Sequence, residues 1–176
     1  MRLVIRGCTG SGKSTLSSQV GAKLGIPSFD LDDFYHLPDW QQRPREEMRA
    51  NVREALGAEA WALAGNYSYC DDLVLPRITH LVWLDYSRSF TFLRLLRRTA
   101  RRVVTGEPCC NGNRELLGKS LSRNGILYWH ITSYARMHER AERFFADPEY
   151  EAIVRHRFRR PAETEAWLRS LPGGQA

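Results

Sequence analysis

A glycine-rich segment directly behind a short apolar run constrains the fold of this chain more than any other feature. The run Leu3-Val4-Ile5 is followed by Gly7-Cys-Thr-Gly-Ser-Gly-Lys-Ser-Thr15, and apolar side chains then recur every fourth residue from Leu16. This order predicts a buried strand over residues 2–6, a tight loop, and a helix over residues 13–24.

The loop has the Gly-x4-Gly-Lys-Ser spacing of a P-loop, with Lys13 and Ser14 at its end. Glycines let consecutive backbone N–H groups point at one anion, and the helix N-terminus adds the positive end of its dipole. The pattern predicts an ATP site in which Lys13 spans the β- and γ-phosphates, Ser14 holds Mg²⁺ through its hydroxyl, and Thr15 supports the α-phosphate. The expected nucleotide-binding residues are Gly7, Gly10, Ser11, Gly12, Lys13, Ser14 and Thr15.

Strands that alternate with helices are expected along the rest of the chain. Further strands are predicted over residues 27–30, 61–64, 79–84 and 152–154, and helices over residues 44–56, 90–105, 126–145 and 161–171. The stretch 31–40, between a strand and a helix, is expected to be an acidic and aromatic loop. Such alternation predicts a mostly parallel sheet covered on both faces, in a three-layer α/β/α P-loop NTPase fold with five strands.

The chain of 176 residues is long enough for one α/β domain and short for two. Residues 106–125 carry four glycines and scattered charges, too irregular for a core element and too long for an ordinary connection. We therefore expect a single domain, residues 1–176, with a lid-like insertion at about 106–125.

Several function classes do not fit the sequence. No apolar stretch approaches the roughly 20 residues that cross a bilayer, so a cytoplasmic protein with no membrane partner is expected. The four cysteines lack CxxC spacing, which favours free thiols. The chain has no Asn-Lys-x-Asp segment, as a GTPase switch would, and is short for a motor ATPase. A small phosphotransferase remains the best-fitting class.

The basic charge is concentrated in one region. Residues 88–160 hold 16 Lys and Arg against 7 Asp and Glu, within a chain of net charge +6, and 23 of its 26 basic residues are arginine. Arginine suits phosphate oxygens. The region fits a phosphate-binding lid or a nucleic-acid surface, while codon bias and a solvated face explain it equally simply.

Several segments together resemble the adenylate-kinase-related P-loop proteins that are often labelled topology modulation proteins. The segments are Gly7–Thr15, Leu31-Asp32, Trp61–Ser68, Leu75-Pro-Arg77, and Val82–Asp85 followed by Arg94 and Arg97-Arg98. The resemblance covers about residues 1–105 and returns weakly over residues 155–171. It implies an adenylate-kinase-like fold with five parallel strands, ATP as phosphate donor and Mg²⁺, and it names no acceptor.

The resemblance also suggests roles for particular side chains. It implies that Asp32 faces the acceptor hydroxyl, that Arg94 packs near the adenine, and that Arg98 reaches the phosphates. A turn-capping carboxylate and an exposed cationic helix face are the plainer alternatives.

Other acceptor-side and lid-side residues are candidates by their chemistry. Trp40 offers a stacking face, Asn66 a hydrogen bond and Arg77 an anion contact, while Arg136 lies where a lid would close over the phosphates. For Trp40, packing within its own loop is an equally simple explanation.

One position departs from the related proteins. They usually carry an aspartate before the Gly-Asn pair, where it holds Mg²⁺ through water, and Ala64 stands there in this chain. Either Asp32 or Asp85 takes over part of that role, or turnover is slow or absent.

The expected function is ATP-dependent phosphate transfer to a small acceptor, with a nucleotide or nucleoside preferred. A nucleic-acid-interacting ATP-binding protein and a catalytically weak nucleotide-binding module are the alternatives. The sequence fixes neither the acceptor nor the oligomeric state.

Overall fold

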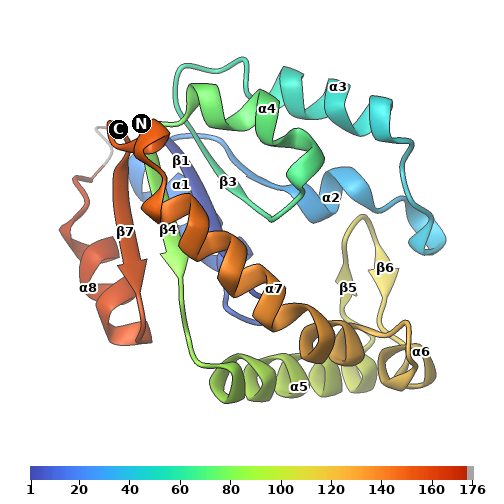
Figure 1. Ribbon diagram of the computed structural model, residues 1–176. Coiled ribbons are helices and arrows are strands. Elements are labelled where there is room, and N and C mark those ends of the chain that lie inside the picture. Colours follow the sequence, from blue (N-terminus) through green and yellow to red (C-terminus); the bar gives the residue numbers. More distant parts are fainter. Residues whose placement is uncertain (174–176) are drawn as a thin grey trace.

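One parallel sheet of five strands organises the chain, as Figure 1 shows for this computed structural model, which describes residues 1–173. In spatial order the strands are β2 (Ser28–Asp30), β3 (Trp61–Ala64), β1 (Arg2–Gly7), β4 (His80–Leu84) and β7 (Val154–Phe158). The glycine-containing strand β1 is therefore central, and the α/β class with a five-stranded parallel sheet is confirmed.

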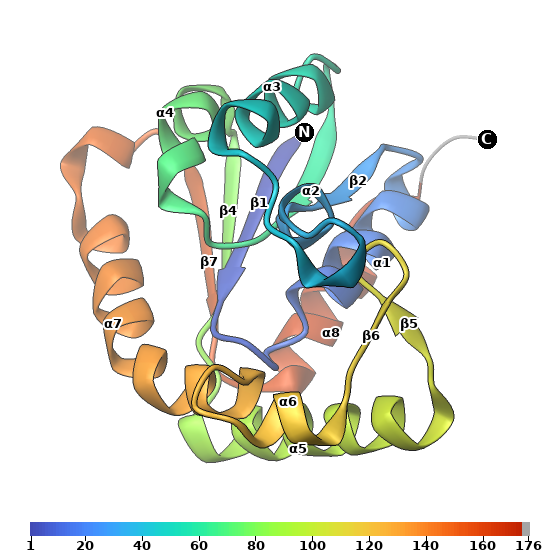
Figure 2. The same cartoon turned by 90° about the vertical axis from the view of Figure 1, so that its right-hand side faces the viewer.

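Helices cover both faces of this sheet (Figures 1 and 2). The helices are α1 (Lys13–Leu24), α2 (Leu31–Tyr35), α3 (Arg45–Ala55), α4 (Asp71–Val74), α5 (Arg88–Thr105), α6 (Leu117–Leu121), α7 (Ile126–Ala146) and α8 (Pro161–Ser170). Four 3₁₀ turns join them: η1 (Pro38–Trp40), η2 (Ser68–Cys70), η3 (Leu75–Arg77) and η4 (Pro148–Tyr150). Among the described residues, no helix combines the length and apolarity that a bilayer crossing requires.

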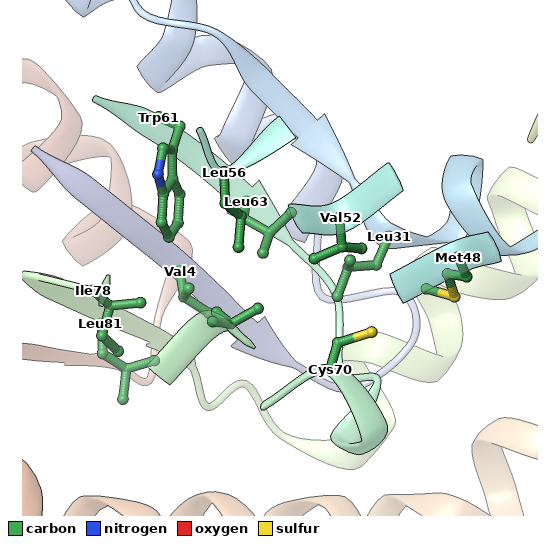
Figure 3. Packing of buried hydrophobic residues seen from close by; sticks show 11 residues of the cluster. Val4, Leu31, Met48, Val52, Leu56, Trp61, Leu63, Cys70, Ile78 and Leu81 are labelled. Carbon is green, nitrogen blue, oxygen red and sulfur yellow. The ribbon is translucent and has the colours of Figure 1, made fainter. Parts of the chain in front are cut away.

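Alternation along the strands divides the core into two layers. Val4 and Leu63 face one side, together with Val52 of α3 (Figure 3). Side chains of α4 and of the end of α7 pack in the same layer. Leu3 and Ile5 face the other side, against α1 and α8. Because successive side chains of a strand point to opposite faces, the short apolar run at the start of the chain supplies both layers.

Most boundaries agree with the sequence pattern, and two segments differ. Residues 31–40 are not only a loop, since α2 begins there with the Asp30 side chain accepting a hydrogen bond from the Asp32 N–H at 3.0 Å. The last strand runs over 154–158 instead of 152–154, because its pairing with β4 starts at His80 and Val154. It is an edge strand of mixed polarity, whereas the preceding apolar Ile153 packs against the core from a turn.

The predicted insertion is partly regular. It contains a two-stranded antiparallel hairpin, β5 (Pro108–Cys109) and β6 (Asn113–Arg114), and then α6. The hairpin rises from the end of α5 toward α2 (Figure 2). At its tip, Asn111 Nδ2 donates to the carbonyls of Asp33 and His36 at 2.5 and 2.6 Å.

The positions of two leucines predict that their substitution by alanine has very different effects on the free energy of unfolding. Leu63 is 1% exposed between β1 and β2, whereas Leu121 on α6 is 64% exposed. We expect Leu63→Ala to lower the free energy of unfolding by about 2–4 kcal/mol, and Leu121→Ala by less than about 0.5 kcal/mol. Urea denaturation measures both, and equal losses would contradict the core assignment.

Candidate functional site

Four strand ends meet at one edge of the sheet. Gly7 of β1 pairs with Leu84 of β4, while Ala64 of β3 pairs with Asp30 of β2. Because all five strands are parallel, their carboxyl ends share this edge, where ligands of open α/β sheets usually bind. The glycine loop, residues 7–12, leaves the sheet here and leads into α1.

The N-terminus of α1 has no side-chain cap. Gly12 is its N-cap residue, with φ 97°, and the first turn contains no acidic residue. The first N–H groups of a helix have no partner within the helix and carry the positive end of its dipole. These groups are thus left for a ligand at the head of a 12-residue helix.

The glycine loop lies tightly against α5. Gly10 has φ 83°, and a Cβ on it would come within 2.4 Å of the Thr91 carbonyl oxygen. A Cβ on Gly12 would come within 3.1 Å of Arg94 Nη2. Larger residues at Gly10 would therefore push α5 away from the loop, in addition to the strain of the positive φ.

Lys13 turns back over the loop from the first position of α1. Its Nζ donates to the Cys8 carbonyl at 3.1 Å. Burial lowers the pKa of this ammonium and nearby Asp32 raises it, with a net lowering. Inside the loop the Ser11 hydroxyl is buried and has no hydrogen-bond partner among the described residues.

Arg94 of α5 contacts the loop, whereas Arg98, on the same helix, lies beside Glu115 of the insertion. Arg94 Nη1 donates to the Ser11 carbonyl at 3.3 Å, and its guanidinium lies 5.6 Å from the Phe90 ring centre. Arg98 lies one turn further along α5, and its charge contributes to the lowered pKa of Lys13. Positive charge thus lies on the α1 and α5 sides of the loop.

Acidic side chains face the loop from β2 and α2. Burial and the neighbouring Asp32 raise the pKa of Asp30 to about 6, while a hydrogen bond from the Ser14 hydroxyl lowers it. Asp32 accepts a hydrogen bond from the Tyr67 hydroxyl at 2.7 Å. Asp30, on the strand next to Ala64, is therefore a carboxylate close to Ser14, and both residues line one small pocket. The expected role of Asp32 stays a prediction.

Asp85 is engaged elsewhere. Its carboxylate lies 2.8 Å from Arg157 and 3.0 Å from His138 Nε2, and its side chain is 8% exposed. Asp85 is thus held by an arginine and a histidine in this structure, and its expected part in replacing the missing aspartate stays a prediction.

A cavity of about 400 Å³ lies between α7 and the carboxyl ends of β1 and β4. Gly7 and Cys8 form one wall, so it adjoins the glycine loop. Other lining residues include Asn66, Trp83, Trp129, Tyr134, Arg136 and His138. Arg136 lies 5.5 Å from the Trp129 ring centre.

The remaining acceptor-side candidates lie in different places. Asn66 donates from Nδ2 to the Gly7 carbonyl at 2.6 Å and lines the cavity. Trp40 instead docks on the hairpin, where its N–H and Nε1 donate to Asn113 and Arg114 at 2.8 and 3.0 Å. Arg77 precedes β4, at the opposite edge of the sheet, about 15 Å away by the length of that strand. Arg77 is therefore not brought to this site.

Sequence reasoning missed two groups at the site. It did not single out Asp30, although the position of this residue at a strand end was a usable signal. It also did not single out His138, because only the packing of α7 against β4 brings that ring to Asp85 and the cavity.

Comparisons of this chain with models of known protein families and with curated proteins find no match. The fold and the site define an α/β protein with a glycine loop, an uncapped helix N-terminus and several cations at the carboxyl edge of a parallel sheet. Its function is inferred from that geometry.

The buried carboxyl group at Asp30 predicts a pH-dependent stability. Its pKa is about 6 in the folded protein against an ordinary 3.8, so its contribution to stability is full below pH about 4 and is lost as pH rises through 6. The loss is at most about 3 kcal/mol. We expect Asp30→Asn to melt at a higher temperature than the wild type at pH 8 and at a similar temperature at pH 4.

Thermal unfolding at the two pH values tests this. Asparagine keeps an oxygen for the Asp32 N–H, so the cap of α2 is retained. Glu59→Gln, which removes an exposed carboxylate, is the control. The same stability difference at both pH values for Asp30→Asn would contradict the assignment.

Proposed function

We propose that this protein is an ATP-dependent phosphotransferase of the adenylate-kinase-like P-loop class, which moves the γ-phosphate of ATP to a small acceptor. A nucleotide or nucleoside is the preferred acceptor. The observation that carries the proposal is the uncapped N-terminus of α1 behind the glycine loop, with Lys13 and Arg94 beside it. Few ligands other than a polyphosphate match so many donors around one loop.

The surrounding side chains support transfer as well as binding. Phosphoryl transfer depends on positioning and on stabilising charge that spreads over the transferred group. In this proposal Lys13 and Arg98 contact the terminal phosphates, and Arg94, which lies beside Gly12, covers the start of α1. The hairpin already contacts the α2 region, so we propose that it acts as a lid that excludes water from the reaction.

The residues present fit a magnesium ion. In nucleotide sites Mg²⁺ keeps several waters and phosphate oxygens as ligands, so one hydroxyl and one carboxylate suffice from the protein. Ser14 supplies the hydroxyl, and Asp30 beside it supplies the carboxylate that Ala64 lacks. The ion would neutralise charge on the phosphates. The described residues hold no cluster of three or more metal-binding side chains, and this mode of binding requires none.

The cavity beside Gly7 is the best candidate for the acceptor site. Its volume of about 400 Å³ suits a ligand of nucleotide size, and Trp83, Trp129 and Tyr134 offer flat apolar surface. The described ion pairs do not include Arg136, so its charge is free for an anionic group. His138, paired with Asp85 at 3.0 Å, can accept a proton from an acceptor hydroxyl in this wall. Asp32 does not line the cavity, and its proposed part is to orient groups near Lys13.

The alternatives have less support. Many arginines of the basic region are engaged by carboxylates or carbonyl groups of the protein itself, which leaves fewer for a nucleic-acid surface. They are Arg94 at Ser11, Arg98 and Arg102 at Glu115, Arg140 at Asp71, Arg155 at Phe145, and Arg157 at Asp85. The reading as a weak nucleotide-binding module rested on Ala64, and Asp30 offers a carboxylate for the same role.

Lys13→Ala tests the nucleotide site. Losing the ammonium of Lys13 at the loop should weaken ATP·Mg²⁺ binding by at least tenfold and abolish acceptor-stimulated ADP formation. Calorimetry and a coupled assay over a panel of nucleotides, nucleosides and other hydroxylated metabolites measure both. Lys119→Ala, an exposed lysine on α6, is the control. If no acceptor raises turnover of the wild type above slow hydrolysis, the transferase proposal fails.

Arg136→Ala tests the acceptor cavity. Removing a charge-assisted contact should raise the KM for an anionic acceptor about 10- to 100-fold and leave ATP binding unchanged. Arg143→Ala is the matched control, because Arg143 lies on the same helix, pairs with Glu139 and does not line the cavity. Equal effects of the two substitutions would place the acceptor elsewhere.

A further inference from the structure

Glu115 forms an unusual charge cluster behind the glycine loop. It follows the hairpin, and its side chain is 6% exposed. Oε1 accepts a hydrogen bond from Arg102 Nη1 at 3.0 Å and lies 3.6 Å from Arg98 Nη2. Two guanidinium groups of α5 therefore share a single carboxylate oxygen.

The cluster is not electrically balanced. Oε2 of Glu115 and the Nε atoms of Arg98 and Arg102 are buried without partners among the described residues. Buried charges are normally paired, because an uncompensated charge is costly to desolvate. Two cations face one anion here, and Arg98 follows Arg94, which contacts the glycine loop, by one turn of α5. The excess positive charge of Arg98 and Arg102 favours the binding of a further anion between this cluster and the glycine loop.

We propose that Glu115 is a positioning residue that competes with polyphosphate for Arg98. It holds Arg98 and Arg102 while the loop is empty, and thereby sets how much negative charge a ligand must bring to engage Arg98. This inference rests on the proposed function, in which the loop binds a polyphosphate. The inference adds that the carboxylate of Glu115, which lies on the insertion, limits the affinity of the loop for polyphosphate. The position of the hairpin and the binding of phosphate are therefore coupled.

Competition predicts a gain of affinity on mutation. Glu115→Gln keeps the size and the hydrogen-bonding oxygen of the side chain but removes its charge. With both arginines uncompensated, inorganic tripolyphosphate should bind about tenfold more tightly than to the wild type. The gain should shrink at 1 M salt, where screening acts over about 3 Å. A residue that only stabilised the fold would, on mutation, weaken binding or leave it unchanged.

Calorimetry with tripolyphosphate, at low and high salt, tests the inference on the full chain. Glu107→Gln is the matched control, because Glu107 pairs with Arg101 at 2.9 Å at the other foot of the hairpin and both side chains are largely exposed. The affinity of the Glu107→Gln variant for tripolyphosphate should stay within about twofold of that of the wild type. If Glu115→Gln does not fold, Glu115→Asp, which withdraws the carboxylate by one methylene, should give a smaller gain.

The outcomes separate this inference from the function on which it rests. If the wild type binds tripolyphosphate and neither Glu115 variant binds it more tightly, the competing role of Glu115 is wrong and the nucleotide site stands. If neither the wild type nor the variants bind it, the proposed function and this inference are both overturned.

Discussion

The close packing of the glycine loop between β4 and α5 is the constraint on which the arrangement of this site depends. A Cβ at Gly10 would meet the backbone of Thr91, and one at Gly7 would come within 2.9 Å of the Leu84 carbonyl oxygen. Only a loop without side chains at these points lets α5 cross directly behind it. That crossing brings Arg94 to the loop, with Arg98 one turn further along the helix, and it also places the hairpin that follows α5 opposite α2.

Charge at the site is divided between the two sides of the loop. Cations come from α1 and α5, whereas the carboxylates of Asp30 and Asp32 come from β2 and α2. This division of charge suits an anionic ligand that has a metal cation bound to it, because the carboxylates can face the metal and the cations can face the anion. Much of the basic charge that is prominent in the composition is held by internal carboxylates, including Asp71, Asp85 and Glu115. Total charge is therefore a poor guide to the surface that a partner would meet.

The strength of the local signals explains which elements could be predicted. The helix over 13–24 and the strand over 61–64 were predicted with their observed bounds, because periodicity and glycine stops act within the segment itself. The last strand was misplaced, because its bounds follow from pairing with β4 and its own residues are of mixed polarity. The short helix α2 was missed, because a side-chain cap at Asp30 outweighs a stretch without helical periodicity.

The sequence by itself determined the alternation of strands and helices, the glycine loop, and the side chains at the head of α1, since these depend on neighbours within a few residues. Only the tertiary structure decided which carboxylate stands beside Ser14, that Arg77 lies at the wrong edge, and that Trp40 meets the hairpin instead of an open pocket. Those outcomes depend on strand order and on contacts between residues more than 70 positions apart, such as Trp40 with Arg114. No local pattern encodes such contacts, because each results from the packing of elements whose positions the whole sheet fixes.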